Sequence, residues 1–182
     1  MMKIFKLGAI LILLINSGYS QQYEDSKSIH QEQLEFYNQL GNSTADFYES
    51  TIKYSEKSFT RSGCNLNKVV YGWHPYWVGS VYHNYDWNLL SHFSFFSYEV
   101  NPIDGEPITT HGWSTSAAVD SALASGNTKV TLTVTLFSDH ATFFSSTTSQ
   151  QTLISNLINL VQSRGAHGVN IDIEGLPSAY KI

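Results

Sequence analysis

The sequence has few charged residues, and basic ones are especially scarce. Lys and Arg total 10 of 182 residues against 15 Asp and Glu, which gives a formal net charge of −5. A nucleic-acid partner needs a basic face that neutralises phosphates. The basic residues form no cluster along the chain, so we exclude nucleic acids as partners.

Cysteine is nearly absent as well. Cys64 is the single cysteine, so no disulfide can form within the chain. It lies in the polar stretch RSGCNLNK, and we interpret it as a spare thiol. Stability must therefore come from a hydrophobic core, for which the sequence supplies 42% hydrophobic and 14% aromatic residues.

No apolar run is long enough to span a bilayer, which takes roughly 20 residues. The longest N-terminal run, residues 7–15, follows Lys3 and Lys6 and precedes the small residues Gly18 and Ser20. These are the three parts of a secretory signal. We expect residues 1–20 to be a signal peptide, and the mature protein to be secreted or periplasmic, with no membrane partner after cleavage.

The rest of the chain divides by composition. Residues 21–66 are polar, with apolar residues at loose helical spacing, and predict one or two weak helices broken near Gly41. We interpret this part as an N-terminal segment or linker without evident chemistry. Residues 67–182 hold four strand-length runs rich in β-forming residues, at 68–73, 92–100, 129–137 and 168–174.

Helices separate these runs. Residues 147–165 have an amphipathic pattern, with Thr148 and Gln151 placed as a capping box and Gly165 as a stop. A shorter helix is predicted at 114–127 and a poorly marked one at 85–90. Alternating strands and helices predict a parallel sheet, either doubly wound or a (β/α)8 TIM-type barrel. The G-x-G-x-x-G turn of dinucleotide-binding folds is missing after the first run, so we expect a barrel and no cofactor.

The last run, GVNIDIEG, places Asn170, Asp172 and Glu174 on one face, because residues two apart on a strand project to the same side. Each unpaired polar group buried on a parallel sheet costs about 1–3 kcal/mol. A protein keeps such a row where the groups bond one another or meet a polar ligand, and in a barrel that place is the active site. A solvated edge strand is the alternative.

These residues resemble glycoside hydrolase family 18, the chitinases and their relatives, whose pattern is D-G-x-D-x-D-x-E at the end of the fourth barrel strand. Gly168, Asp172 and Glu174 match it, Asn170 replaces an acid, and His167 stands at the first Asp. VVYGWHPYW and LLSHFSFFSYEVNPIDGE are similar to the family's first two strands, so the resemblance covers residues 68–177. The third strand departs from the family, with Thr133-Val134-Thr135-Leu136 in place of S-x-G-G.

The resemblance implies a substrate-assisted mechanism on β-1,4-linked N-acetylglucosamine glycans, either chitin or the glycan of peptidoglycan. Glu174 would protonate the glycosidic oxygen while the substrate's acetamido carbonyl oxygen attacks. Asp172 would orient the acetamido N–H and raise the proton affinity of Glu174, and Asn170 would hold Asp172 by a hydrogen bond. From where the family places its aromatic residues, we expect Trp73 and Tyr98 to form sugar platforms.

Other chemistry has weaker support in the sequence. The histidines show no H-x-H or H-E-x-x-H spacing, so we expect no metal site. The neighbours Ser138, Asp139 and His140 lack a nucleophile elbow, and we expect them to form a loop after the third strand.

A (β/α)8 barrel takes about 250 residues, whereas this chain offers only the first four βα units. We therefore expect a truncated barrel half, inactive by itself, whose partner is the missing C-terminal half. The function is either that of a glycoside hydrolase or that of a non-catalytic glycan-binding relative.

Overall fold

The computed structural model describes residues 27–52, 67–177 and 180. The expected signal peptide and Cys64 lie outside these residues. Within the described ranges, no helix combines the length and the apolar character needed to cross a membrane.

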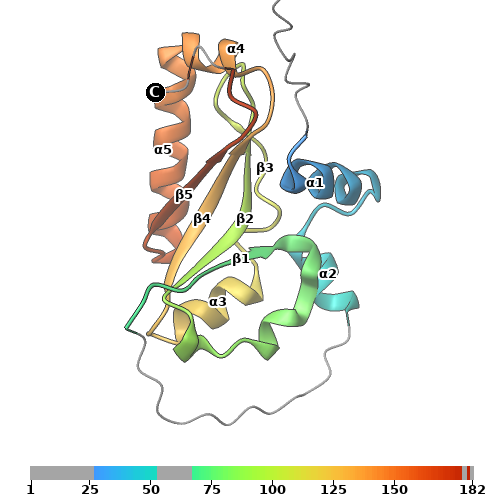
Figure 1. Cartoon of the computed structure of the whole chain (residues 1–182), viewed down its shortest axis with the longest axis vertical. Helices are drawn as coiled ribbons and strands as arrows, with labels where there is room; N and C mark the ends of the chain where they lie inside the picture. The colour runs from blue at the N-terminus through green and yellow to red at the C-terminus, as the bar shows by residue number, and fades with distance from the viewer. Residues whose placement is uncertain (1–26, 53–66, 178–179, 181–182) are drawn as a thin grey trace, which may run out of the picture.

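A twisted sheet forms the centre of the molecule (Figure 1). Its hydrogen-bonded order is β1-β2-β4-β5, with every neighbouring pair parallel, and the short β3 pairs antiparallel with β2. The strands are β1 (Tyr71–Pro75), β2 (His92–Val100), β3 (Pro107–Thr109), β4 (Lys129–Leu136) and β5 (Gly168–Ile173).

The parallel strands follow one another across the sheet in chain order. A doubly wound sheet reverses its order at a switch point, whereas a (β/α)8 barrel does not. The structure therefore confirms the α/β class and the parallel sheet, and the strand order is compatible with a TIM-type barrel.

Helices lie on both sides of this sheet, with α5 on one side and α1 on the other in Figure 1. Asn156 of α5 bonds the Tyr98 hydroxyl of β2, whereas His30 of α1 contacts the ring of Phe96 on the opposite side of the same strand. The helices are α1 (Ile29–Gln39), α2 (Ala45–Thr51), α3 (Ala117–Ala124), α4 (His140–Ser145) and α5 (Thr147–Arg164), with 3-10 helices η1 (Tyr76–Asn84) and η2 (Trp87–Leu89).

Most predicted elements are present with shifted ends. The strand predicted at 68–73 is β1 at Tyr71–Pro75, and the two weak helices are α1 and α2. The capping box at Thr148 is wrong, because the extended Ser146 caps α5 by accepting a hydrogen bond from the Ser149 N–H at 3.2 Å. Gly165 ends α5 in the left-handed conformation (φ 66°), as predicted.

Two local predictions differ from the structure. The connection between β1 and β2 contains η1 and η2 in place of an α-helix at 85–90, and Asp86 caps η2 by accepting from the Asn88 N–H at 3.1 Å. Ser138 and Asp139 lie in the expected loop after the third strand, whereas His140 begins the short helix α4.

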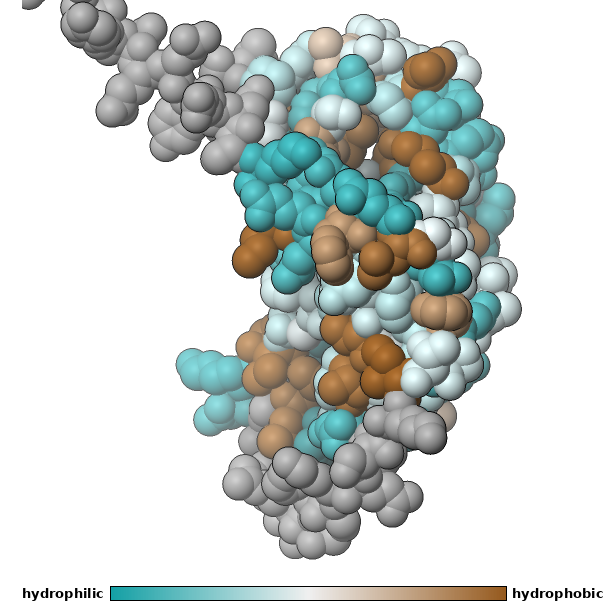
Figure 2. All heavy atoms as spheres, turned by 90° about the vertical axis from the view of Figure 1, so that its right-hand side faces the viewer, coloured by the Kyte–Doolittle hydropathy of each residue, from teal (hydrophilic) through white to brown (hydrophobic). Residues whose placement is uncertain are grey.

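Polar contacts stabilise the packing of the N-terminal helices against the rest of the molecule. Glu49 of α2 accepts hydrogen bonds from the Ser116 hydroxyl at 2.8 Å and from the Ala117 N–H at 2.9 Å, at the start of α3. A carboxylate at a helix N-terminus satisfies unpaired N–H groups and complements the helix dipole. Figure 2 views the molecule from the side of α1 and α2 and shows separate hydrophobic groups among polar surface.

Among the glycines in the described residues, Gly105 leaves the least room for a side chain. Its φ is +79°, and a Cβ added there would lie 2.0 Å from the Ser149 carbonyl oxygen at the start of α5. Its own carbonyl accepts from the Tyr98 hydroxyl at 2.7 Å. The turn after β2 is thus pressed against α5, and only glycine fits.

Gly105→Ala is expected to lower the free energy of unfolding by about 2–4 kcal/mol, because the new methyl group clashes with backbone and the residue keeps a positive φ. Gly126→Ala is the matched control, since Gly126 also has a positive φ (+71°) but open space around it. Its cost is expected to be about 1 kcal/mol. Urea unfolding measures the free energy of unfolding of both variants. Equal losses of stability would contradict the close approach of Gly105 to Ser149.

Candidate active site

Asn170, Asp172 and Glu174 lie on one face at the carboxyl end of β5, as predicted. Asn170 is in register with Thr133 of β4, and Asp172 with Thr135. The Glu174 N–H donates to the Leu136 carbonyl at 3.2 Å, so the ladder continues one residue past β5 and fixes the direction of Glu174.

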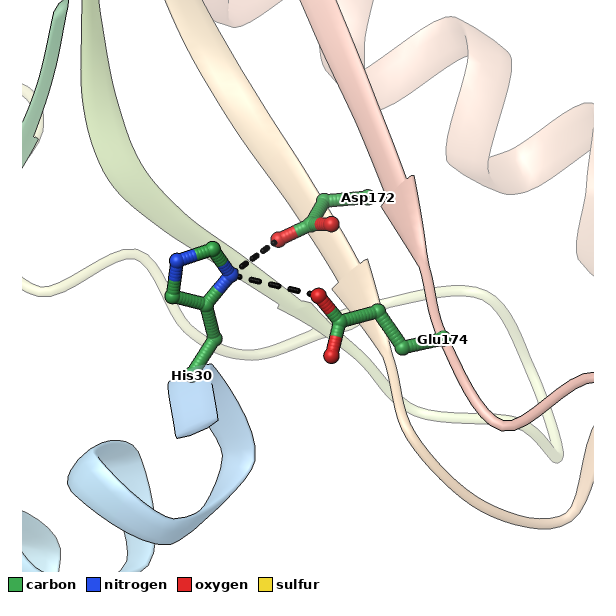
Figure 3. A group of neighbouring side chains, drawn as sticks. All are labelled: His30, Asp172 and Glu174. Carbon is green, nitrogen blue, oxygen red and sulfur yellow. Dashed lines mark hydrogen bonds and ion pairs between the residues drawn. The ribbon is translucent and has the colours of Figure 1, made fainter. Parts of the chain in front are cut away.

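Both carboxylates point toward α1. Figure 3 shows His30 of α1 directed between Asp172 and Glu174. His30 Nδ1 lies 3.2 Å from Glu174 Oε1 and 3.4 Å from Asp172 Oδ2. The carboxylate side chains are only 18% and 25% exposed, so they are turned away from α5 and from open water.

Several contacts fix the position of α1 over this face. Ser28 caps the helix by accepting from the Gln31 N–H at 3.0 Å, and Leu34 is buried in the core. At the other end, Asn38 donates to Glu99 Oε1 at 3.2 Å and accepts from the Tyr76 hydroxyl at 2.7 Å. His30 is therefore carried by a helix held at both ends.

A buried histidine extends this network. His111 Nε2 contacts the Glu99 carboxylate, and its Nδ1 lies 2.5 Å from the Ser43 carbonyl oxygen. Its ring stacks on Tyr76 with centroids 3.8 Å apart. Oxygen atoms face both ring nitrogens. His111 thus links Ser43, in the α1–α2 connection, to Glu99 on β2.

Burial and the neighbouring Glu174 raise the pKa of Asp172 from 3.8 to about 6, with His30 acting in the opposite direction. Desolvation disfavours a buried charge, and a second carboxylate nearby disfavours it further. The two acids therefore form a coupled pair that retains a proton well above the usual range of an aspartate.

This pair is not fully bonded. Asp172 Oδ2 and Glu174 Oε2 are buried and have no hydrogen-bond partner among the described residues. The hydrogen bond expected between Asn170 and Asp172 is not formed in this part of the chain, and His30 lies beside Asp172 instead. The site thus contains two buried acceptor oxygens with unused capacity.

The two expected sugar platforms have different positions. Trp73 is 46% exposed, and its ring centroid lies 6.4 Å from that of His30, beside the carboxylates. Tyr98 is fully buried and is not available as a platform. The register with β4 shifts between Phe96 and Tyr98, and this bulge turns the Tyr98 ring toward α5.

Hydroxyl groups line the sheet beneath the site. The Ser94 and Thr133 hydroxyls lie 2.7 Å apart, and the Tyr71 and Thr131 hydroxyls 3.1 Å apart. They share the face of Asp172, because they alternate along β1, β2 and β4 in register with it. The substituted third strand thus supplies polar groups that bond across the sheet.

Two cavities lie beside the site, where α1 faces the loop after β4. One, of about 280 Å³, is lined by Glu99, Thr135 and Asn38 among others. The second, of about 480 Å³, reaches Gly175 directly after Glu174. Gln31 of α1 lines both cavities, whereas Asp172 and Glu174 line neither.

His30 is the site residue that the sequence did not reveal. It lies 144 residues before Glu174, on a helix interpreted as part of a polar segment without chemistry. No local spacing connects the two positions, and only the packing of α1 on the sheet brings them together.

The chain resembles two solved structures at low similarity. The sporulation-specific glycosylase YdhD from Bacillus subtilis matches with a TM-score of 0.39 and 21% identity, over 47% of this chain and 30% of that chain. The spore cortex-lytic enzyme SleL from Bacillus cereus matches with a TM-score of 0.36 and 22% identity, over 47% and 20%. The chain thus spans under a third of either structure. Neither a family model nor a curated protein matches it.

Asp172 predicts a specific pH dependence of stability. Because its folded-state pKa of about 6 lies above 3.8, the folded protein holds the proton more tightly than the unfolded chain. Stability is therefore lost as pH rises through this interval. Asp172→Asn lacks this titration. The free energy of unfolding of the variant should therefore rise relative to that of wild type as the pH increases from about 4 to 7. Urea unfolding at several pH values tests this; a constant difference, like that expected for the exposed control Asp139→Asn, would contradict it.

Proposed function

We propose that the protein is an exported glycoside hydrolase that cleaves β-1,4-linked N-acetylglucosamine glycans, with Glu174 as the general acid. The observation that carries the proposal is the convergence of Asp172 and Glu174 on one point, within 3.4 Å of a single nitrogen atom. Two neighbouring carboxyl groups can divide the roles of proton donor and charge-stabilising carboxylate.

The resemblance implies the roles of the two acids, and the geometry of the strand end is consistent with them. Glu174, beyond the end of β5 and nearer the cavity at Gly175, protonates the glycosidic oxygen. Asp172, one pleat deeper, accepts the acetamido N–H and stabilises positive charge that develops as the acetamido oxygen attacks the sugar carbon. The glycan supplies the nucleophile, so the protein needs only one proton donor.

His30 occupies the position that this mechanism assigns to the substrate. A nitrogen 3.2 Å from Glu174 and 3.4 Å from Asp172 leaves no room for a sugar between them. A glycan bound to both carboxylates therefore takes the place of the imidazole, and the first turn of α1 must shift when it binds.

Glu174→Gln tests the assignment of the acid. In a protein with the complete barrel, release of the chromophore from a chitobiose aryl glycoside is expected to fall by about 10²–10⁴-fold, because the amide cannot donate the proton. Glu106→Gln, at an exposed acid, is the control and should keep wild-type activity. Hydrolysis that survives Glu174→Gln unchanged would exclude Glu174 as the acid.

A non-catalytic glycan-binding protein is the second candidate, and the closed contact of His30 with both carboxylates favours it. Such a protein would bind N-acetylglucosamine oligomers without hydrolysing them in any variant. The chromophore assay and a binding isotherm on the wild-type protein separate the two functions.

Trp73 is proposed to stack on a sugar ring. Trp73→Ala should raise KM about tenfold with little change in kcat, because the indole offers an apolar surface to the sugar and does not take part in proton transfer. Phe36→Ala, at another exposed aromatic residue (57%), is the control. A loss confined to kcat would assign Trp73 a different role.

A further inference from the structure

Three side chains from opposite ends of the chain offer ligand atoms at one point. His30 Nδ1 and one carboxylate oxygen each from Asp172 and Glu174 all lie within 4.8 Å of one another (Figure 3). One nitrogen and two oxygen donors form a mixed set that suits transition-metal ions.

Hydrogen bonding alone does not account for this arrangement. Nδ1 carries at most one hydrogen, which can point at one acceptor, yet two carboxylate oxygens lie at 3.2 and 3.4 Å from it. Asp172 Oδ2, the oxygen at 3.4 Å, makes no hydrogen bond, and neither does the buried Glu174 Oε2 among the described residues.

The two printed separations at His30 Nδ1 fit tetrahedral coordination, and the third is within 4.8 Å. Ligands bound tetrahedrally to Zn²⁺ at about 2.0–2.1 Å stand about 3.3–3.4 Å apart. The two separations at Nδ1, 3.2 and 3.4 Å, are close to these edges. We propose that His30, Asp172 and Glu174 bind a divalent transition-metal ion of the Zn²⁺ class, which joins α1 to the end of β5.

The helix and the strand that carry the ligands hold them in defined positions. His30 lies on a helix anchored by Leu34 and Asn38, and Asp172 lies on a strand of the central sheet. A cavity lined by Ser28 and Gly175 lies beside the chain neighbours of His30 and Glu174.

Metal binding would regulate the site if the proposed function holds, and this consequence alone rests on that function. An ion held by both carboxylates blocks protonation of the glycosidic oxygen and keeps His30 where the glycan must bind. Zn²⁺ would therefore inhibit hydrolysis by competing with the substrate.

Calorimetric titration of the tag-free, chelator-treated protein with Zn²⁺ tests the site. One ion per chain is expected to bind, and Co²⁺ should give the intense visible absorption of a tetrahedral complex. His30→Ala should weaken Zn²⁺ binding at least 100-fold, as should Asp172→Asn, whereas His83→Ala, at an exposed histidine of η1, should leave it unchanged.

His30→Cys separates loss of a ligand from loss of the fold, because a thiolate is also a Zn²⁺ ligand and should restore binding that His30→Ala removes. Wild-type protein that does not bind Zn²⁺, or affinity that His30→Ala leaves unchanged, would overturn the proposal. Zn²⁺ binding at these residues without glycan hydrolysis would contradict the proposed function alone. Hydrolysis that saturating Zn²⁺ leaves unaffected would overturn the regulation.

Discussion

Two acidic side chains lie close together in a small, half-buried space at the end of β5. The N-terminal helix α1 reduces the energetic cost of this arrangement. Like charges brought together away from water raise each other's energy, which is why the pKa of Asp172 rises to about 6. His30 lowers that pKa, and α1 is the element that delivers it. The docking of α1 is thus an electrostatic requirement of the site as well as a packing contact.

The N-terminal segment is consequently part of the folded domain. Asn38 joins α1 to Glu99 on β2, His111 joins the same carboxylate to the connection after α1, and Glu49 caps α3 from α2. These polar contacts join α1 and α2 to β2 and α3, and they add to the burial of Leu34, Ala45 and Tyr48 in the core.

The fold could be predicted from the sequence where the signal was periodic. Alternation marked β2, β4 and β5, and helical spacing with a terminal glycine marked α5. The same alternation placed Asn170, Asp172 and Glu174 on one face, because nothing interrupts β5.

Features set by tertiary structure escaped the sequence. Period-two alternation along β2 assigns Tyr98 to the face of Phe96, but the bulge between them reverses its direction, and a bulge leaves no periodic trace. His30 could not be found because its partners are 144 residues away and its helix has an ordinary polar pattern. The cap of α5 was misplaced within a run of six Ser and Thr residues, 145 to 149 and 152, in which several hydroxyls could serve.

The paired hydroxyls of Ser94, Thr133, Tyr71 and Thr131 have a consequence for movement at the site. An aliphatic sheet face would resist contact with water if the site opened. These hydroxyls bond one another when water is absent and can bond water that reaches them. The sheet is therefore stable whether or not water reaches this face. The carboxylates can exchange His30 for another ligand without disruption of the strands that carry them.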